Sequence, residues 1–409
     1  MINVIDKKDC CGCEACVQQC PKHCITMELD DELFYYPVVD AKSCVSCGLC
    51  EDVCPQLNAD VPQIPLKVFA AKNLNEEERM QGSSGGIFMA LARHFIKQHG
   101  GVVYGVVYDS DWNVCFTYTE NIEGVKAMVG SKYVQAKVGD VYKKVKAHLK
   151  EERVVLFTGT PCQIAALKRF LRKEYDNLFL MDVLCAGAPS PGVWRKYFNE
   201  NVLSAAQRAA VGKNTVLPSL NAISSIEGIT FRDKSQHGWE KYSFVVKGNS
   251  ASKADKNSVL LSSIHSENSY MRGFLSSLYK RRSCHACKFR GGESHSDITV
   301  ADFWGIKQLM PDFADDKGVS LVLVRTIKGS EVFSSLPLDF RESNYVEVKS
   351  LNGGFKNQKI NSKRGLFYEL LRKEESFDVA LKTALHVSCT MYVLSFFIRA
   401  FRKILCIIK

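Results

Sequence analysis

Seventeen cysteines in 409 residues are the part of this sequence with the most distinctive chemistry. Two runs share one spacing, in which gaps of two, two and three residues separate the cysteines and a proline follows the last. The runs are Cys10, Cys13, Cys16, Cys20 with Pro21, and Cys44, Cys47, Cys50, Cys54 with Pro55. A two-residue gap lets one turn of backbone wrap a metal cluster with its amides aimed at the sulfurs, and proline then ends the run.

The doubled spacing predicts two [4Fe-4S] clusters. A zinc site usually takes two Cys-x2-Cys pairs separated by a longer loop, and a disulfide framework is rare where no leader segment is seen. In this pattern the fourth cysteine of each run ligates the other cluster. The predicted sets are Cys10, Cys13, Cys16 with Cys54, and Cys44, Cys47, Cys50 with Cys20. About residues 5–60 resemble the two-cluster ferredoxins, which implies transfer of single electrons. Cys11 and Cys24 fall outside the pattern and are expected to be packed thiols.

The composition is that of a globular protein, with 46% hydrophobic and 24% charged residues. The N-terminus has no apolar leader segment, so a cytoplasmic location is expected. The net charge of +10 is spread along the chain and accompanies no nucleic-acid-binding motif. We therefore expect no nucleic-acid partner.

The rest of the chain alternates apolar strands with helices. Residues 56–66 contain two prolines and no periodic pattern, which indicates a linker. Strands are predicted within 100–109, 153–171, 177–187, 297–305 and 319–329, with the 153–171 strand turning into an amphipathic helix. This rhythm predicts an α/β domain with a mostly parallel sheet covered on both faces. The predicted fold is an α+β ferredoxin-like dicluster domain, then this α/β domain, then a helical C-terminal tail.

Four more cysteines lie in predicted loops, where ligands of such sheets gather. Cys162 and Cys185 each follow a strand, and Cys284 and Cys287 form a Cys-x2-Cys pair before another. Their spacing leaves two interpretations open: one shared site of four thiolates, or two packed thiols beside an independent dithiol or zinc pair. Cys115, Cys389 and Cys406 show no partner pattern and are expected to be packed thiols.

Several longer motifs resemble the coenzyme F420 hydrogenase/dehydrogenase beta-subunit family. They are FTGTPCQIAALKRFL, LCAGAPSP, SCHACKFR, SDITVADFWGI, SSGGIFMALARHFI and GSKYVQ, and with the ferredoxin unit the resemblance covers about residues 5–335. It implies a bound FAD and a third [4Fe-4S] cluster on Cys162, Cys185, Cys284 and Cys287. Many relatives have histidine after the cysteine that matches Cys185, whereas this chain has Ala186. Any hydrogen bond or proton delivery from that position is therefore in doubt.

The resemblance also selects residues for the flavin. In 83–96 two serines and two glycines precede a helical run, so that Ser83 or Ser84 is expected to cap the helix and its first amides to approach an anion. The predicted cofactor residues are Ser83, Ser84, Gly85, Gly86, Ser131, Lys132, Tyr133, Thr158, Gly159 and Thr160. Lys132 would neutralise a phosphate or a reduced flavin, and a solvated surface lysine is the alternative.

No catalytic residue can be assigned from the sequence, but the candidates are Asp302, Trp304 and Lys132. Asp302 and Trp304 follow a strand, as pocket residues do, although Trp304 would serve equally well as a core residue. Residues 231–244 add Arg232, Lys234 and Trp239 as possible pocket residues. His237 and His285 are possible proton relays, and the alternative for each is a structural histidine.

The predicted domains are 1–60 for the two clusters, 61–150 for the flavin, 151–340 for the third cluster and substrate, and 341–409 as a C-terminal extension. Within that extension, 384–398 carries no charge apart from His386 and is too short to span a membrane. It fits either an interfacial helix, giving peripheral membrane contact, or a helix docked on protein.

The expected function is that of an iron–sulfur flavoprotein oxidoreductase. It would pass electrons between a ferredoxin or redox partner subunit, three [4Fe-4S] clusters and FAD, and reduce or oxidise a small organic substrate or an F420-like acceptor. Relatives joined to a ferredoxin unit also occur among surface-polysaccharide genes, so a role there is conceivable. Two alternatives stay open: an electron-transfer subunit without catalysis of its own, and a structural zinc protein with a degenerate flavin fold.

Overall fold

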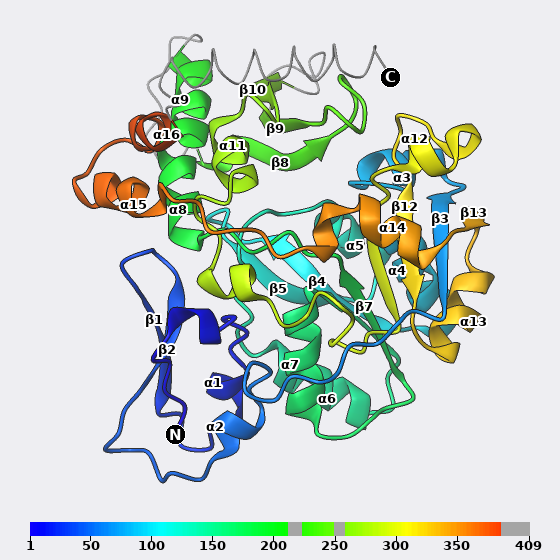
Figure 1. The fold of residues 1–409 in the computed structure, drawn as a ribbon, viewed down its shortest axis with the longest axis horizontal. Helices are drawn as coiled ribbons and strands as arrows, with labels where there is room; N and C mark the ends of the chain where they lie inside the picture. The colour runs from blue at the N-terminus through cyan, green and yellow to red at the C-terminus, as the bar shows by residue number, and fades with distance from the viewer. Residues whose placement is uncertain (212–222, 249–257, 386–409) are drawn as a thin grey trace, which may run out of the picture. The chain divides into compact units, whose positions relative to one another are not determined.

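The computed structural model describes residues 1–211, 223–248 and 258–385 (Figure 1). It divides into two compact units, residues 1–360 and 361–409. Among the described residues, no helix is long and apolar enough to cross a membrane. Most of the predicted 384–398 helix lies outside the described residues.

The N-terminal region is small and contains one hairpin and two short helices. Strands β1 (Ile25–Leu29) and β2 (Tyr35–Val39) pair antiparallel, with Ile25 opposite Val39. Helices α1 (Ala15–Gln19) and α2 (Leu49–Asp52) each begin within a cysteine run. This confirms the predicted α+β dicluster region.

An eight-stranded sheet forms the centre of the first unit, in the order β13-β3-β12-β11-β7-β6-β4-β5. The strands in that order are Leu338–Glu342, Lys67–Asn73, Ser320–Val324, Ile298–Asp302, Leu178–Val183, Val155–Gly159, Val102–Tyr108 and Val114–Thr119. The central strands β11, β7, β6 and β4 are parallel, and β12, β13 and β5 pair antiparallel with their neighbours. With β3, five strands run in one direction, so the predicted mostly parallel α/β sheet is confirmed.

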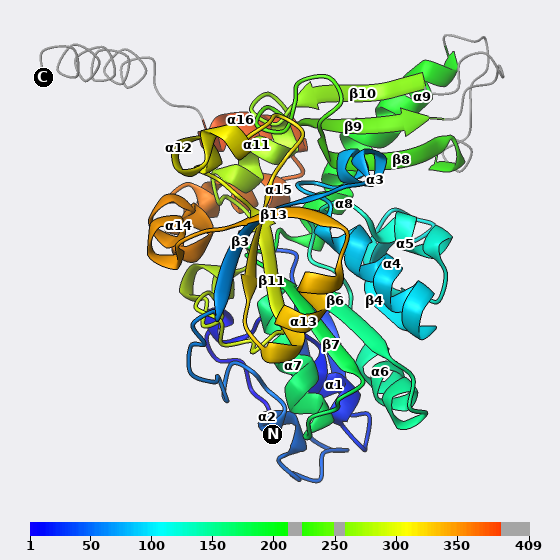
Figure 2. The ribbon, with the colours of Figure 1, turned by 90° about the vertical axis from the view of Figure 1, so that its right-hand side faces the viewer.

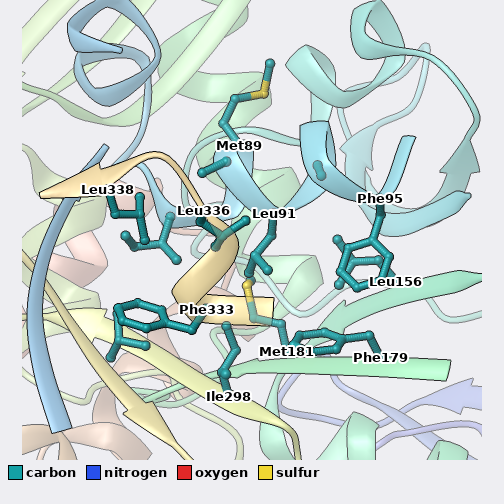
Figure 3. Close-up of a cluster of buried hydrophobic side chains, with 14 of the residues drawn as sticks. Met89, Leu91, Phe95, Leu156, Phe179, Met181, Ile298, Phe333, Leu336 and Leu338 are labelled. Atoms are coloured by element: carbon teal, nitrogen blue, oxygen red, sulfur yellow. The ribbon is translucent and has the colours of Figure 1, made fainter. Parts of the chain in front are cut away.

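Helices cover both faces of this sheet. On one face α4 (Ile87–His99), α5 (Ile122–Met128) and α13 (Ile327–Ser335) pack onto apolar side chains of β4, β6, β7 and β11. Figure 3 shows the core of that layer, in which Leu91, Phe179 and Met181 meet. The other face is covered by α6 (Val141–Lys150), α7 (Pro161–Leu171), α12 (Ile306–Leu309) and α14 (Tyr345–Leu351). Figure 2 shows α4 and α5 on the opposite side of the sheet from α12 and α14.

A second, three-stranded sheet was not expected from the sequence. It has the order β10-β9-β8, and the strands are Ser258–Ile264, Ser243–Gly248 and Ile226–Asp233. Helices α8 (Pro191–Tyr197), α9 (Ser204–Val211) and α11 (Ser269–Leu275) belong to the same part of the chain. In the second unit, α15 (Arg364–Arg372) packs against α16 (Phe377–Leu385).

The segment before α4 folds differently from the prediction that a serine caps the helix. The N-cap is Gly86, whose φ of 82° is left-handed, and no side chain caps the helix. Ser84 instead donates its hydroxyl to the carbonyl of Val319, and Gly85 accepts from Asn73 N–H at 2.7 Å. These bonds tie the segment to β3 and the start of β12, so the serines are used for anchoring and not for capping.

Gly85 is packed too tightly for any side chain. A Cβ there would lie 2.3 Å from the Ala71 carbonyl oxygen and 2.7 Å from the Ser320 amide nitrogen. We expect Gly85→Ala to lower the free energy of unfolding by about 1–3 kcal/mol through overpacking, seen as a lower apparent Tm. Gly228→Ala is the control, since nothing lies within 4 Å of its added Cβ. Equal melting of the two variants would contradict this account.

Candidate functional site

The structure places the cysteines predicted for one N-terminal cluster around a single small cavity. Its lining includes Cys20 from the first run together with Cys44, Cys47 and Cys50 from the second. The Ile2 N–H points at the Cys50 sulfur at 3.3 Å, as backbone amides do toward cluster sulfurs. Cys24, expected to be a packed thiol, lies with its sulfur 3.4 Å from that of Cys20 and lines the same cavity.

The other N-terminal set has no exposed member, since Cys13 is buried and Cys10, Cys16 and Cys54 are half-buried. Burial, together with the nearby thiolates of Cys10 and Cys54, raises the pKa of Cys16. Burial also raises the pKa of Cys54, and the thiolate of Cys10 adds to it. Buried thiolates repel one another and cannot all ionise in the absence of a cation. Bound iron removes that obstacle because a coordinating thiol is deprotonated outright, so this donor set fits a cluster.

The four loop cysteines of the main domain converge. Cys162, Cys185, Cys284 and Cys287 line one cavity at the ends of β6 and β7. Burial, followed by the thiolates of Cys284 and Cys162, raises the pKa of Cys185 to about 12. Backbone N–H groups already point at two of the sulfurs, from Gly187 to Cys185 and from Ala188 to Cys284, both at 3.3 Å.

Cys11 is a fifth thiol in this cavity, and no spacing signal in the sequence predicts it there. The neighbouring Cys11 thiol, followed by burial, raises the pKa of Cys162, and both residues line this cavity. Cys11 lies between Cys10 and Cys13, so the loop that supplies these two cysteines reaches the cavity of the main-domain set.

Single-ion geometry is not found. In the described part of the chain, no three His, Cys, Asp or Glu side chains converge closely enough to hold one metal ion. In a [4Fe-4S] cluster each thiolate binds a different iron, so its ligands stand further apart than those of one ion. The shared cavities are therefore the relevant observation for the set of Cys20 and for the set of Cys162, and the effect of Cys10 and Cys54 on the pKa of Cys16 is the relevant one for the remaining set.

A cavity of about 780 Å³ lies at the carboxyl ends of the parallel strands. That volume is within the range of pockets for small molecules and cofactors. Nine of the ten predicted cofactor residues line it: Ser83, Ser84, Gly86, Ser131, Lys132, Tyr133, Thr158, Gly159 and Thr160. The tenth, Gly85, is packed against Ala71 and Ser320 as described above. Asp302, Trp304 and Arg232 line the cavity too, and so do Cys162 and Cys185.

Two loops of the cavity wall are joined by a serine pair. The Ser83 hydroxyl oxygen accepts from Ser131 N–H at 2.8 Å and from the Ser131 hydroxyl at 2.9 Å. Helix α4 begins at this wall, and its first residues Ile87 and Phe88 are lining residues. The first amides of a helix have no partner within the helix and carry the positive end of its dipole. This part of the cavity is therefore suited to an anion.

Lys132 is not a solvated surface residue. Burial lowers the pKa of its ammonium group to about 8. Its Nζ lies 3.3 Å from the Met128 carbonyl oxygen and 3.4 Å from that of Val129. The structure pairs it with no carboxylate of the described residues, so a charge there is compensated by carbonyl dipoles and by the Tyr108 ring, whose centre lies 5.6 Å from Nζ.

Arg232 connects the serine loop to the end of β11. Its two terminal nitrogens bind the Asp302 carboxylate at 2.6 and 3.0 Å, and they also donate to the Tyr133 hydroxyl and the Ser83 carbonyl oxygen, both at 3.3 Å. Its Nε is buried with no hydrogen-bond partner. Asp302 also accepts from the indole N–H of Trp239 at 2.8 Å. Trp304 stacks on Trp239, with ring centroids 4.9 Å apart.

The other polar candidates of the sequence lie outside the cavity wall. The Lys234 ammonium donates to the carbonyls of Arg79, Ser84 and Lys317, and this holds the serine loop in place. His237 contacts the Ser243 hydroxyl at 3.0 Å, and His285 contacts the Gln358 carbonyl oxygen at 2.9 Å. These bonds agree with a structural role for both histidines.

Hydrogen bonds also dock the N-terminal region onto the main domain. Glu14 accepts from the backbone N–H groups of Val138 and Gly139, both at 2.9 Å. The Gln18 side chain accepts from Tyr142 N–H at the start of α6. Gln135 donates to the carbonyl oxygen of Cys11 at 3.0 Å. The two cysteine-rich regions are thus held against each other by several independent contacts.

Comparisons with known proteins match two parts of the chain to families. Residues 9–58 match the 4Fe-4S dicluster domain, and residues 152–353 match the family described as the C terminus of the coenzyme F420 hydrogenase/dehydrogenase beta subunit. A solved structure of the F420-reducing [NiFe] hydrogenase complex from Methanosarcina barkeri, a xenon derivative, contains a similar chain. That chain is 16% identical, the match covers 79% of this chain and 92% of that one, and the TM-score is 0.45. No curated protein matches.

The fold and the cysteine sets define the class as an iron–sulfur oxidoreductase. Over residues 152–353 the chain belongs to the coenzyme F420 hydrogenase/dehydrogenase beta-subunit family, and it carries a 4Fe-4S dicluster domain at residues 9–58. This confirms the resemblance seen in the sequence motifs.

Iron content tests the main-domain set. After anaerobic purification we expect about twelve irons per chain, and about eight in Cys162→Ser and in Cys284→Ser, because each change breaks one cluster of four. Cys115→Ser is the control, since Cys115 lies on β5 and lines none of these cavities. Full iron content in both variants, or about three zinc ions in a colourless protein, would rule out a third cluster on these cysteines.

Proposed function

We propose that this chain is an iron–sulfur flavoprotein oxidoreductase that passes electrons between a protein partner, three [4Fe-4S] clusters and FAD, and so reduces or oxidises a small organic substrate. The coarser part, an oxidoreductase of the named family with a dicluster domain, rests on the sequence matches. The FAD, the third cluster and the substrate are our proposal.

One observation carries the proposal. Cys162 and Cys185 line the same cavity as the serine loop and Lys132. Cys162 and Cys185 also belong to the four-cysteine cavity. A group bound in the large cavity therefore lies beside the thiolates of the proposed third cluster, with no protein layer between the two sites. Electron exchange requires such proximity.

The residues of the cavity fit a dinucleotide flavin. The start of α4 and the Ser83 hydroxyl, whose own O–H is not used in the bonds from Ser131, supply donors for a pyrophosphate. Lys132, which also lines the cavity, supplies a positive charge. When bound, FAD exchanges single electrons with a cluster and two electrons, as a hydride equivalent, with an organic substrate.

Asp302 and Arg232 hold the cavity wall in one arrangement. Since Arg232 binds Asp302 bidentately and also reaches the Tyr133 hydroxyl and the Ser83 carbonyl, it fixes β8, β11 and both loops relative to one another. Trp304 lies beside this pair and presents an aromatic surface to the cavity. We assign these residues to the positioning of cofactor and substrate, and we assign proton transfer to none of them.

The dicluster region provides the entry for the partner's electrons. Cys47 is exposed, whereas Cys13, Cys20 and Cys50 are buried. The set that contains Cys47 is therefore the one that a protein donor or acceptor reaches. An F420-like acceptor and a sugar derivative of surface-polysaccharide synthesis are both compatible with a substrate cavity of this size.

Purification and turnover distinguish this function from electron relay alone. We expect the anaerobically purified chain to contain one FAD, and to oxidise a chemically reduced F420-type deazaflavin or reduce a dye at the expense of dithionite. The measurements are flavin release after denaturation and the absorbance change during turnover. Bound FAD with no turnover of any organic acceptor would favour the electron-transfer subunit, and absence of FAD from the iron-replete protein would reject the flavin proposal.

The pH dependence of flavin binding tests Lys132. Its pKa of about 8 means that the charge is present below pH 8 and lost above it. We expect FAD to bind the wild-type apoprotein about tenfold more tightly at pH 7 than at pH 9, since a charged hydrogen bond contributes about 1.5–3 kcal/mol. Lys132→Met should bind weakly at both pH values, and Lys132→Arg should keep its affinity at pH 9. The same pH dependence in all three proteins, measured by flavin fluorescence, would contradict the assignment.

A further inference from the structure

Arg281 is a buried cation at the junction of the dicluster region and the main domain. Its relative exposure is 0%, which is rare for an arginine. It lies three residues before Cys284, and its own carbonyl accepts from the Cys284 N–H at 3.0 Å. The residue is thus connected to the main-domain cysteine set through its backbone.

The guanidinium group reaches into the first cysteine run. It donates to the Cys10 carbonyl oxygen at 2.7 Å and to the Cys10 sulfur at 3.4 Å. Further bonds run to the Gln135 side chain at 3.1 Å and the Tyr35 carbonyl oxygen at 3.0 Å, and the group stacks 4.1 Å from the Tyr36 ring centre. Its position is therefore fixed from several sides.

Arg281 forms no ion pair with any carboxylate in residues 1–211, 223–248 and 258–385. Glu14, which is close enough to sense the charge, gives its oxygens to the amides of Val138 and Gly139. A buried charge with no counter-charge is strongly destabilising. The guanidinium does contact the Cys10 sulfur, which as a proposed cluster ligand would supply the negative charge.

We propose that Arg281 raises the reduction potential of the cluster held by Cys10, Cys13, Cys16 and Cys54, and so makes it the preferred electron site of the dicluster domain. A positive charge and a hydrogen bond to a ligand sulfur both stabilise the reduced, more negative cluster. The proposal rests on the proposed ligand set and is independent of FAD.

The position of the Cys10 set affects the direction of electron flow. Cys47 is exposed in its set, whereas the Cys10 set adjoins the main-domain cysteines through Cys11, which lines the same cavity as Cys162. A higher potential at the Cys10 set draws one electron from the exposed cluster toward the main domain. Arg281 thereby biases transfer inward, away from the surface where the partner binds.

The test is a redox titration of the full chain followed by electron paramagnetic resonance, with iron content measured on each sample. In Arg281→Gln we expect one of the three cluster potentials to fall by at least the 59 mV that corresponds to a tenfold change in a one-electron equilibrium. Arg281→Lys keeps the charge but loses the planar set of guanidinium donors. The potential of this cluster in Arg281→Lys should therefore lie between its values in the wild type and in Arg281→Gln. The potential of the cluster that contains Cys47 should not change, and that of the main-domain cluster should fall by less, because the Arg281 charge also acts on Cys162 and Cys284.

Arg282→Gln is the matched control. Arg282 also contacts the dicluster region, through an ion pair with Glu32, but it reaches no cysteine. Unchanged potentials in both Arg281 variants at full iron content would overturn the proposal. So would loss of the first cluster from both of them, because Arg281 would then serve only to hold the loop. A wild-type chain with four irons or fewer would instead count against the ligand sets themselves.

Discussion

The contacts that fix the loop of Cys10, Cys11 and Gly12 are the constraint on which this structure depends. Gln135 and Arg281 bind the carbonyl oxygens of this loop from the main domain, and the left-handed φ of 68° at Gly12 lets the backbone come close to both side chains. Because one loop supplies proposed ligands on one side and touches Cys162 on the other, its position sets the separation of two redox sites. Movement of this loop would disturb both.

The sheet brings together residues that lie far apart in the sequence. The carboxyl ends of β6, β7 and β11 lie at one edge, and Cys162, Cys185 and Asp302 are found where these strands end. The serine loop joins them because β3 runs in the same direction as these strands. The hydrophobic core on both faces of the sheet stabilises the fold. The loops at this edge can therefore carry cysteines and hydroxyl groups without a loss of stability.

Much of this was predictable from local patterns. The doubled cysteine spacing indicated the dicluster region, and the apolar runs indicated β4, β6, β7, β11 and β12, although not that β12 runs antiparallel. Residues whose role comes from tertiary contacts were not predictable: Cys11 carries no spacing signal, and Arg281 looks like one of two ordinary arginines before a Cys-x2-Cys pair. The prediction that a serine caps α4 was also wrong, because the Ser84 hydroxyl donates to the Val319 carbonyl and Gly86 is the N-cap of the helix.

Cys20 of the first run lies in the cavity lined by the cysteines of the second run, and this placement has a consequence for folding. A cluster in that cavity bonds residue 20 to residues 44–50, so it closes a loop of the chain much as a disulfide does. Such a crosslink lowers the conformational entropy of the unfolded region, and neither half of the repeat can bind its iron fully without the other. Cluster insertion and folding of residues 9–58 are therefore coupled, so that removal of the iron also removes stability from this region.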